Sequence, residues 1–433
     1  MDKVTMVSLG CPKNQIDAET MLGLLTERGY QITLQPEQAD IIIVNTCAFI
    51  DQARQESITK ILEMAEFKKS GKCRQLIVTG CLSQLHYQEL ARELPEVDAF
   101  LGTGSIEQIS TVISSNKSVH QPPEHYRGCA ETRRLFSTFP YGYLKIAEGC
   151  NHTCSYCIIP RLRGPLRSKD PGQIIAEAKK MAVEGIKEIV LIAQDTSQYG
   201  FDRTGKSELP GLLSALEQVE EIGWIRLLYC YPDHIGDDLI EIMAGARKLR
   251  CYLDIPIQHS HPDILYSMGR NPRATGGRPL IEKLRLRLPG IALRTTLIVG
   301  YPGETEEHFQ HLLDFVRWAE FDQLGAFMYS KEDGTRAAKL PKQISSKTKA
   351  RRYRLLMQAQ QEVVRTRNLR LVGSRFQGLI DTVIDGRAVI RSYREAPEVD
   401  SVIFAQANGH QPGDFVNITC TGYQGYDLIG EIE

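Results

Sequence analysis

Three cysteines near the middle of the sequence have a spacing that suits a metal site. Cys150, Cys154 and Cys157, in the stretch GCNHTCSYC, are spaced C-x3-C-x2-C. Thiolate is the soft ligand that iron–sulfur clusters need, so these residues can hold three irons of a four-iron cluster. No fourth cysteine follows at ligand spacing, which leaves one iron open to another molecule. A zinc site is the alternative, but zinc motifs usually combine two C-x2-C pairs.

A second set of three cysteines is spread over the N-terminal part of the chain. Cys11, Cys47 and Cys81 each follow an apolar stretch, in SLGC, IVNTC and IVTGC. If these stretches are parallel strands, their carboxyl ends meet at one edge of a sheet, where ligands bind. A single free cysteine is usually a core residue. Three cysteines at equivalent strand ends predict a second set of iron–sulfur ligands.

The other cysteines and a pair of histidines lack a ligand pattern. His259 and His261, in IQHSH, would share one face of a strand, and a structural or cofactor-contact role is favoured over metal binding. The remaining cysteines are predicted to be packing residues: Cys73, Cys129, Cys230, Cys251 and Cys420.

The elements that must position the first cysteines alternate between strand and helix. Strands are predicted over 4–10, 39–46, 75–80 and 97–104, with amphipathic helices between them. Continuous apolar strands separated by helices indicate a parallel sheet that is covered on both faces. Residues 116–137 contain prolines and glycine without periodicity, and they are predicted to be a linker.

From residue 138 a longer series of strand–helix repeats begins. Six repeats predict a partial (βα)6 barrel of the TIM type, with its active site at the carboxyl ends of the strands. Cys150 would follow the first of these strands directly. The strands are predicted over 143–148, 188–193, 225–230, 252–257, 292–300 and 324–329.

The C-terminal part of the chain changes character. Residues 342–370 predict a basic helical connector. Residues 371–433 contain short strands separated by Gly, Pro, Asp and Asn, which predict a small antiparallel β-barrel of about five strands, similar to an OB fold. We therefore expect an α/β protein with three domains, which cover residues 1–133, 136–367 and 369–433.

Composition limits the class of protein. The chain has 433 residues, 42% of them apolar and 24% charged, which excludes a disordered chain and a single small core. No apolar run approaches the roughly 20 residues that cross a bilayer, and the N-terminus lacks the pattern of a signal peptide. The net charge of −1 gives no basic field for nucleic acid. We expect a cytoplasmic protein whose cysteines serve metal or redox chemistry.

The C-x3-C-x2-C motif, with the aromatic Tyr156 before its last cysteine, resembles the signature of the radical S-adenosylmethionine (SAM) superfamily. From SLGCPKN to the C-terminal barrel, the whole chain resembles a methylthiotransferase of that superfamily. The resemblance implies two 4Fe–4S clusters, one on each cysteine set, and a C-terminal barrel of the TRAM type. It also implies that SAM is both radical source and methyl donor. The cluster on Cys150, Cys154 and Cys157 would be the catalytic one, and Tyr156 a cofactor-binding residue.

Polar residues in the strands of the predicted barrel are further candidates for binding SAM. Gln194 and Asp195 end the second strand, Gln258 ends the fourth, and Arg294 lies in the fifth. For each of these residues, an ordinary structural role in a loop is an equally open explanation. Residues 269–279 depart from the family's pattern, so no contact is predicted there.

The resembled family has two branches, which modify either an adenosine of transfer RNA or the β-carbon of an aspartate in ribosomal protein S-twelve of the small subunit. The stretches SLGCPKNQIDAE, LIAQDTSQYG and REAPEVDSVIF resemble the protein-modifying branch. Residues 371–433 contain four Arg, no Lys and nine Asp or Glu, a net charge of −5 that suits a basic protein better than a phosphate backbone.

These features predict the partners of the chain. We expect S-twelve, in or near the ribosome, and an electron-donor protein as partners, but neither a membrane nor transfer RNA. Candidate docking acids on the barrel are Glu395, Glu398 and Asp400. The same chemistry on transfer RNA stays open as the second hypothesis. A non-catalytic iron–sulfur or zinc scaffold is the hypothesis from another class.

Overall fold

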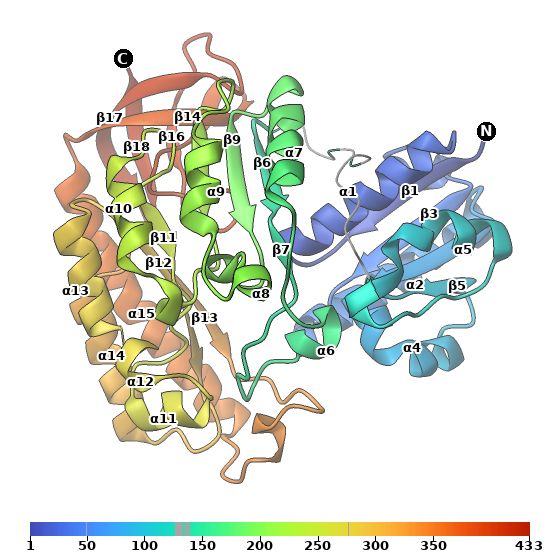
Figure 1. Ribbon diagram of the computed structural model, residues 1–433, viewed down its shortest axis with the longest axis horizontal. Coiled ribbons are helices and arrows are strands. Elements are labelled where there is room, and N and C mark those ends of the chain that lie inside the picture. Colours follow the sequence, from blue (N-terminus) through green and yellow to red (C-terminus); the bar gives the residue numbers. More distant parts are fainter. Residues whose placement is uncertain (49, 126–132, 134, 136–138, 276) are drawn as a thin grey trace. The chain divides into compact units, whose positions relative to one another are not determined.

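The chain folds into two units in a computed structural model (Figure 1). The first unit comprises residues 1–136, 145–152 and 157–177, and the second comprises 137–144, 153–156 and 178–433. The structure describes residues 1–48, 50–125, 133, 135, 139–275 and 277–433. Part of the predicted linker, together with Cys129, lies outside these ranges. No helix within them is long and apolar enough to cross a membrane.

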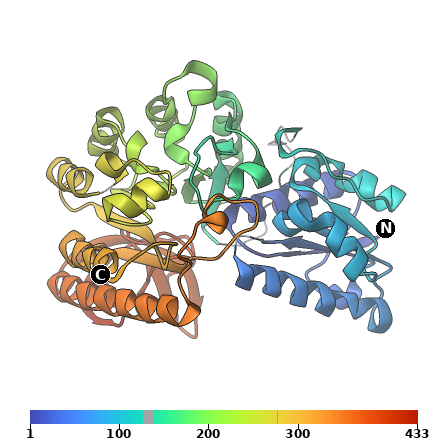
Figure 2. The same ribbon diagram turned by 90° about the horizontal axis from the view of Figure 1, so that it is seen from below.

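The N-terminal sheet is parallel throughout, in the strand order β2-β1-β3-β4-β5. Its elements are β1 (Lys3–Ser8), α1 (Pro12–Glu27), β2 (Gln31–Ile32), β3 (Ile41–Thr46), α2 (Asp51–Ala65), α3 (Phe67–Ser70), β4 (Gln75–Gly80), α4 (Cys81–Glu93), β5 (Ala99–Leu101) and α5 (Ile109–Ser115). Alternate residues of β3 face opposite sides: Ile41 and Ile43 pack with α1, whereas Ile42 and Val44 pack with α2. Helices thus cover both faces (Figure 2), which explains strands that are apolar along their whole length.

Six strands of the middle region form two parallel three-stranded sheets, in the orders β10-β9-β6 and β11-β12-β13. They are β6 (Tyr141–Lys145), β9 (Glu188–Ile192), β10 (Trp224–Leu227), β11 (Tyr252–Asp254), β12 (Ala292–Val299) and β13 (Gln323–Met328). Hydrogen bonds from Ile225 N to Lys248 O (2.8 Å) and from Cys230 N to Asp254 O (2.9 Å) join the two sheets. The partial barrel therefore runs through all six predicted strands. A short antiparallel pair, β7 (Ala147–Glu148) and β8 (Arg167–Ser168), follows β6.

Helices cover the outside of these strands (Figure 1). They are α7 (Pro171–Val183), α9 (Leu209–Leu216), α10 (Asp237–Gly245), α13 (Arg278–Arg287), α14 (Glu306–Ala319) and α15 (Ser346–Leu371). The short helices α8 (Phe201–Thr204), α11 (Pro262–Ser267) and α12 (Pro272–Thr275) lie in the connections that follow β9 and β11, and α6 (Ile159–Arg163) packs against α4 in the first unit. The basic connector is α15, and one of its faces is buried. Its Lys349 Nζ donates to Tyr329 O (2.7 Å), and its Gln360 Nε2 donates to Phe321 O (2.9 Å). The connector is therefore an amphipathic helix packed beside β13.

The C-terminal region is a closed barrel of five strands, in the order β14-β15-β16-β18-β17. Its strands are β14 (Arg375–Ile384), β15 (Arg387–Arg391), β16 (Ile403–Gln406), β17 (Phe415–Gln424) and β18 (Asp427–Ile432). Four of the five pairings are antiparallel, as predicted, but β16 and β18 are parallel. This parallel pair closes the sheet on itself and leaves it without an edge strand.

Buried ion pairs join this barrel to the strands of the middle region. Arg391 of β15 pairs with Asp381 in the barrel and with Glu188 at the start of β9. Arg226 of β10 pairs with the same Glu188 (2.6 Å) and donates to the carbonyl oxygen of Tyr393 (2.7 Å). The side chains of Glu188, Arg226 and Arg391 are at most 1% exposed. Their removal from water is tolerable because each charge has an opposite partner.

Two of the three acids expected to dock a partner are buried at this junction. Glu395 is 2% exposed and accepts hydrogen bonds from Ser392 N and Oγ. The Asp400 carboxylate is fully buried and accepts from Arg294 Nε (3.0 Å) and Tyr252 OH (2.7 Å). Glu398 is exposed, but its carboxylate accepts from two tyrosine hydroxyls of β6. The expectation that these acids form a free docking surface is therefore wrong, because Glu395 is buried, and Asp400 and Glu398 bond to the strands of the middle region.

Candidate functional site

The three N-terminal cysteines lie at the carboxyl ends of three adjacent strands. Cys11 follows β1, Cys47 follows β3, and Cys81 begins α4 directly after β4. The register pairs Ser8 of β1 with Asn45 of β3, so these strands end at the same level. The sheet therefore brings the three cysteines to one edge, where the sequence predicts them.

Glycines in front of two of these cysteines allow a close approach of the strand ends. Gly10 and Gly80 both have a φ of +93°. A Cβ on Gly10 would lie 2.8 Å from Cβ of Cys47, and a Cβ on Gly80 would lie 2.4 Å from Thr46 O. Only glycine fits both the backbone conformation and the space. The Gly–Cys dipeptides are the local sequence signal for this close approach.

The Cys81 thiol is buried, and charges around it act on its pKa. Burial raises the pKa of the Cys81 thiol, Arg163 opposes this effect, and the thiols of Cys11 and Cys47 add to it, giving a value of about 12. Cys47 also lies against the residue before Cys11, since a Cβ on Gly10 would be 3.0 Å from Cys47 Sγ. Three converging thiols are a soft donor set, and a metal centre would replace their protons. The residues therefore fit an iron–sulfur cluster.

A buried arginine contacts the sulfur of Cys81. Arg163 ends α6, and its Nη2 lies 3.5 Å from Cys81 Sγ and donates to Asn14 Oδ1 (2.5 Å). Its Nη1 pairs with Asp17 of α1. The guanidinium is thus held between a carboxylate on one side and a ligand sulfur on the other.

The charges around Arg163 are balanced. Lys145 Nζ donates to Asp17 Oδ1 (2.8 Å) and to Glu148 Oε2 (2.6 Å), and Arg163 Nη1 lies 3.7 Å from the same Glu148 oxygen. All four side chains are at most 9% exposed. Two cations and two carboxylates make a group without net charge, which lowers the cost of its burial.

The C-x3-C-x2-C loop follows the short strand β7. Cys150 and Cys157 belong to the first unit and Cys154 to the second, and all three are half-buried. The backbone N of His152 lies 3.4 Å from Cys150 Sγ, and the backbone N of Ile159 lies 3.4 Å from Cys157 Sγ. Backbone amides therefore point at two of the three sulfurs, as is favourable for thiolate ligands of a cluster.

The segment around Cys154 is tied to the chain near α11. Ser155 N donates to Met268 O (2.8 Å), and Ser155 Oγ lies 2.7 Å from Tyr301 OH. Tyr156 OH accepts from Arg270 Nε (3.1 Å). These bonds fix Ser155 and the Tyr156 side chain, which directly follow Cys154.

Arg270 is a further site residue, which is not among those predicted from the sequence. Its Nη1 donates to Pro256 O (2.6 Å), and its guanidinium lies 4.5 Å from the centre of the Tyr231 ring. Burial lowers the pKa of Arg270, but Tyr156, Cys154 and Tyr231 raise it by more. The residue is thus a permanent cation beside Cys154. It lies within 269–279, where departure from the family's pattern ruled out a prediction.

Of the predicted SAM contacts, Asp195 is already engaged within the protein. It is 2% exposed, caps the turn 196–198 by accepting from Ser197 N (3.0 Å), and pairs with His234 Nδ1 (3.1 Å). Gln194 precedes it and is half-buried at the same strand end. Asp195 therefore shapes the loop, and Gln194 presents its amide beside it.

Gln258 and Tyr229 have strained backbones at neighbouring strand ends. Gln258 has a φ of +73° and Tyr229 a φ of +62°, although neither is glycine. Gln258 is held there because its N donates to Thr296 O (2.8 Å) and its O accepts from Ile298 N (2.7 Å). Such strain usually marks a functional site, which supports a ligand-facing position for Gln258.

Arg294 lies apart from the other predicted contacts. It is near the amino end of β12, where its Nη1 pairs with Asp254 (3.0 Å) and its Nε with Asp400 (3.0 Å). Ligands of such barrels bind at the opposite ends of the strands. This position speaks against a cofactor contact and makes Arg294 part of the junction with the C-terminal barrel.

Glu304 follows the carboxyl end of β12, in the stretch GYPGETEE. Its carboxylate accepts from Gly300 N (2.6 Å) and from Arg352 Nη1 (2.8 Å). Burial nevertheless raises the pKa of Glu304 to about 7, against the opposing effect of Arg352. His259 Nε2 lies 4.0 Å from the carboxylate, and burial holds the pKa of His259 well below its usual value.

Three side chains near α11 form a possible metal-ligand group: His261, Asp263 and His308, whose ligand atoms lie within 4.8 Å of one another. Both histidines already use Nδ1 as a helix cap, His261 for Asp263 N (3.3 Å) and His308 for Thr305 N (3.2 Å). Accepting through Nδ1 leaves the proton on Nε2, which removes the second lone pair. The expected structural role of His261 agrees with this geometry, although β11 ends at Asp254 and the histidine lies beyond the strand.

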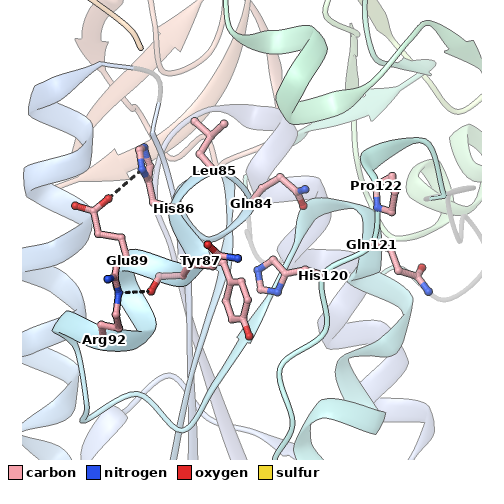
Figure 3. A pocket seen from close by; sticks show the side chains of 10 residues that line it. Gln84, Leu85, His86, Tyr87, Glu89, Arg92, His120, Gln121 and Pro122 are labelled. Atoms are coloured by element: carbon pink, nitrogen blue, oxygen red, sulfur yellow. Dashed lines mark hydrogen bonds and ion pairs between the residues drawn. The ribbon is translucent and has the colours of Figure 1, made fainter. Parts of the chain in front are cut away.

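A cavity of about 590 Å³ opens on the N-terminal domain beside α4 (Figure 3). Tyr87 stacks on His120 there, with 4.1 Å between ring centres, and His120 Nε2 lies 3.1 Å from Ser83 Oγ. Neither cysteine set contributes to its lining, so its position gives no support for a role in the cluster chemistry. The lining residues are Gln84, Leu85, His86, Tyr87, Gln88, Glu89, Arg92, His120, Gln121 and Pro122.

Three family models match successive parts of the chain. Residues 3–102 match the uncharacterized protein family UPF0004, residues 144–316 match the radical SAM superfamily, and residues 372–432 match the TRAM domain. The fold and the cysteine-bearing loop together define a radical SAM enzyme with an additional N-terminal cysteine site and a C-terminal TRAM barrel.

Curated relatives identify the family. A ribosomal protein uS12 methylthiotransferase RimO of Geobacter sulfurreducens is 47% identical over all of this chain and 98% of its own length. The protein of the same name from Lachnoclostridium phytofermentans is 46% identical over the whole of both chains. The chain therefore belongs to the RimO family of ribosomal protein uS12 methylthiotransferases.

Solved structures confirm the fold class. The radical SAM methyltransferase TsrM of Kitasatospora setae, with cobalamin and a [4Fe-4S] cluster bound, matches with a TM-score of 0.56 over 90% of this chain and 80% of its own. The same enzyme with tryptophan and a SAM analogue matches with a TM-score of 0.54 over 75% and 73%. At 13% and 14% identity, these likenesses concern the fold alone.

Proposed function

We propose that this chain transfers a methylthio group to the β-carbon of an aspartate in ribosomal protein uS12. The proposal is supported by full-length identity of 47% with a uS12 methylthiotransferase. The structural observation that carries it is the convergence of Cys11, Cys47 and Cys81 at one sheet edge, in a chain that also has the C-x3-C-x2-C loop. A protein with a single radical SAM cluster would not need this second set of three cysteines.

Each cysteine set would hold a 4Fe–4S cluster with one open iron. When bound, the clusters would supply reductive cleavage of SAM at Cys150, Cys154 and Cys157, and a sulfur atom for transfer at the N-terminal set. SAM would also be the methyl donor. The protein's own contribution is to orient the ligands, because backbone amides point at two of the sulfurs and Arg270 fixes Tyr156.

We assign the polar strand ends of the second unit to the binding of SAM. Gln194 and Gln258 lie at the carboxyl ends of their strands and can contact the cofactor with amide groups that carry no charge. Asp195 acts through the loop that it caps. Arg294 is left out of this assignment because its two carboxylate partners hold it near the amino end of β12.

Recognition of uS12, in or near the ribosome, would use charge. The acids of the C-terminal barrel that remain exposed include Asp385 and Glu431. Ribosomal proteins are basic, and complementary charge speeds association and favours the right partner. A one-electron donor protein would supply the electron for SAM cleavage, because SAM cleavage at an iron–sulfur cluster consumes one reducing equivalent per turnover.

The proposal can be tested in a strain that lacks this protein. Mass spectrometry of uS12 should show loss of the methylthio-aspartate, restoration by the parent chain, and no restoration by the Cys11→Ala/Cys47→Ala/Cys81→Ala variant. Cys251→Ala is the matched control, because Cys251 is a packing cysteine, and it should restore the modification. Methylthio-adenosine in transfer RNA, with the uS12 aspartate unmodified, would instead favour the transfer-RNA reaction.

A further inference from the structure

Arg163 is a buried cation directed at a sulfur atom. Its side chain is 3% exposed, and its Nη2 lies 3.5 Å from Cys81 Sγ. Burial alone would make a guanidinium costly, and Asp17 and Glu148, which both also pair with Lys145, offset this cost. The Nη2 end of the guanidinium is nevertheless directed toward Asn14 Oδ1 and the sulfur.

The neighbours of Arg163 fix this orientation. Asp17 holds Nη1, while Asn14 Oδ1 accepts from Nη2 at 2.5 Å. The amide of Asn14 donates in turn to Thr46 O (2.9 Å) and to Leu9 O (3.1 Å), at the ends of β3 and β1. One asparagine therefore links the guanidinium to two of the strands that carry the cysteines.

We propose that Arg163 is a positioning residue of the N-terminal cluster, which donates a charge-assisted hydrogen bond to the Cys81 sulfur and raises the reduction potential of the cluster. The proposal rests on the proposed function, since it takes Cys11, Cys47 and Cys81 as the ligands. A hydrogen bond to a ligand sulfur withdraws electron density and stabilises the reduced cluster, which carries one more negative charge. A nearby cation acts in the same direction.

Lysine could not reproduce the arrangement. The planar guanidinium reaches the carboxylate and the sulfur at once with two different nitrogens, whereas an ammonium is a single point of charge. The guanidinium of Arg163 therefore also connects α6 to the edge of the N-terminal sheet. Helix α6 lies in the segment that follows Cys157. Both connections lie within the first unit.

The test isolates the N-terminal cluster in the full chain by replacing Cys150, Cys154 and Cys157 with Ala. After anaerobic reconstitution this protein should hold about four irons. Its midpoint potential is then measured by titration with dithionite, which reduces the cluster by one electron. Arg163→Gln should shift the potential to more negative values, and Arg163→Lys should shift it less. Arg161→Gln is the matched control, because Arg161 is an exposed arginine of the same helix, and it should cause no shift.

A second measurement detects the contact directly in the protein that retains Arg163. Pulsed electron paramagnetic resonance of the reduced cluster, in protein labelled with ¹⁵N-arginine, should detect a ¹⁵N coupling that is lost in Arg163→Lys. Absence of the coupling from the Arg163 protein, or equal potentials for Arg163→Gln and Arg161→Gln, would overturn the proposal. Fewer than about four irons before any change at Arg163 would refute the ligand assignment itself, and the proposal with it.

Discussion

Arg270 stands beside Cys154 much as Arg163 stands beside Cys81. Both side chains are buried, both come from segments outside their cysteine motif, and both are held by further hydrogen bonds. A permanent cation near a ligand thiolate offsets negative charge that burial would otherwise make unfavourable. The two sites therefore share an electrostatic arrangement, although one contact is to the sulfur itself and the other passes through Tyr156.

We predict that Arg270→Met lowers the rate of reductive SAM cleavage about tenfold or more. The change removes hydrogen bonds from a charged donor, worth about 1.5–3 kcal/mol each, and frees the Tyr156 side chain beside Cys154. The rate is measured as 5′-deoxyadenosine formed. Arg273→Met, at a nearby exposed position, is the control. Equal rates for the two variants would show that Arg270 only fills space.

Glu304 predicts a dependence of stability on pH. Because folding raises the pKa of Glu304 from 4.5 to about 7, the folded state binds more protons than the unfolded state between these values. Its contribution to the free energy of unfolding therefore falls as pH rises through this window, by up to about 3 kcal/mol.

The measurement compares urea unfolding of the parent and of Glu304→Gln from pH 4.5 to 7. The parent should lose stability relative to the variant as pH rises, which separates the effect of Glu304 from that of the nearby His259. Glu307→Gln, exposed on the first turn of α14, should follow the parent. If the difference in free energy of unfolding between the parent and Glu304→Gln stays constant with pH, the pKa of Glu304 is not raised.

At the scale of elements, the junction between the C-terminal barrel and the strands rests on charge. Glu188 begins β9, Arg226 lies in β10 and Arg391 ends β15, so a single buried network joins three elements from two regions. Networks of this kind contribute little when complete, but they are strongly destabilising when one member is lost.

We therefore predict that Arg391→Met lowers the free energy of unfolding by about 3–5 kcal/mol, because it leaves the buried Asp381 carboxylate without Arg391 and removes one of the two arginines that pair with Glu188. Chemical denaturation measures the effect. Arg387→Met, on the same strand but exposed and stacked on Phe404, should cost no more than about 1 kcal/mol. Similar decreases in the free energy of unfolding for both variants would show that the buried network contributes no more to stability than an exposed arginine.

Strands and helices could be predicted from the sequence where the pattern of apolar residues lies within the segment itself. The six strands of the partial barrel and the parallel N-terminal sheet follow from apolar runs and helical periodicity alone. The parallel pairing of β16 with β18 does not, because it depends on how the barrel closes. The burial of Asp400 was equally hidden, since its partner Arg294 lies 106 residues away in the sequence.

The same limit applies to the candidate site. The six cysteines could be found from spacing and from strand ends, because those features lie within a few residues of each cysteine. Arg163 and Arg270 could not, since their contacts with Cys81 and Tyr156 span 82 and 114 residues. Charge patterning was misleading for Glu395, because nothing in a local stretch distinguishes a solvated acid from a buried one.

At the scale of the whole molecule, the acids that stay exposed decide how a basic partner could dock. We predict that Asp385→Lys/Glu431→Lys weakens association with uS12 and reduces its modification, because both positions are exposed and outside the junction. Association of the parent should also weaken as salt rises, since exposed charges are screened over about 10 Å at 0.1 M.

The control for this docking prediction is Glu37→Lys/Glu93→Lys, which makes the same change of charge on exposed residues of the N-terminal domain. Binding is measured by titration of purified uS12 at several salt concentrations. If both double variants weaken binding equally, only the net charge of the molecule matters, and the barrel is not the docking surface.

The distance of 82 residues between Cys81 and Arg163 also sets an order of events during synthesis. Translation runs from the N-terminus, so a nascent chain presents all three N-terminal thiols while Asp17 still lacks both of its cationic partners, Lys145 and Arg163. A cluster inserted at that stage would be assembled without the guanidinium. Arrival of the later segment would then close the charge group around a centre that is already in place.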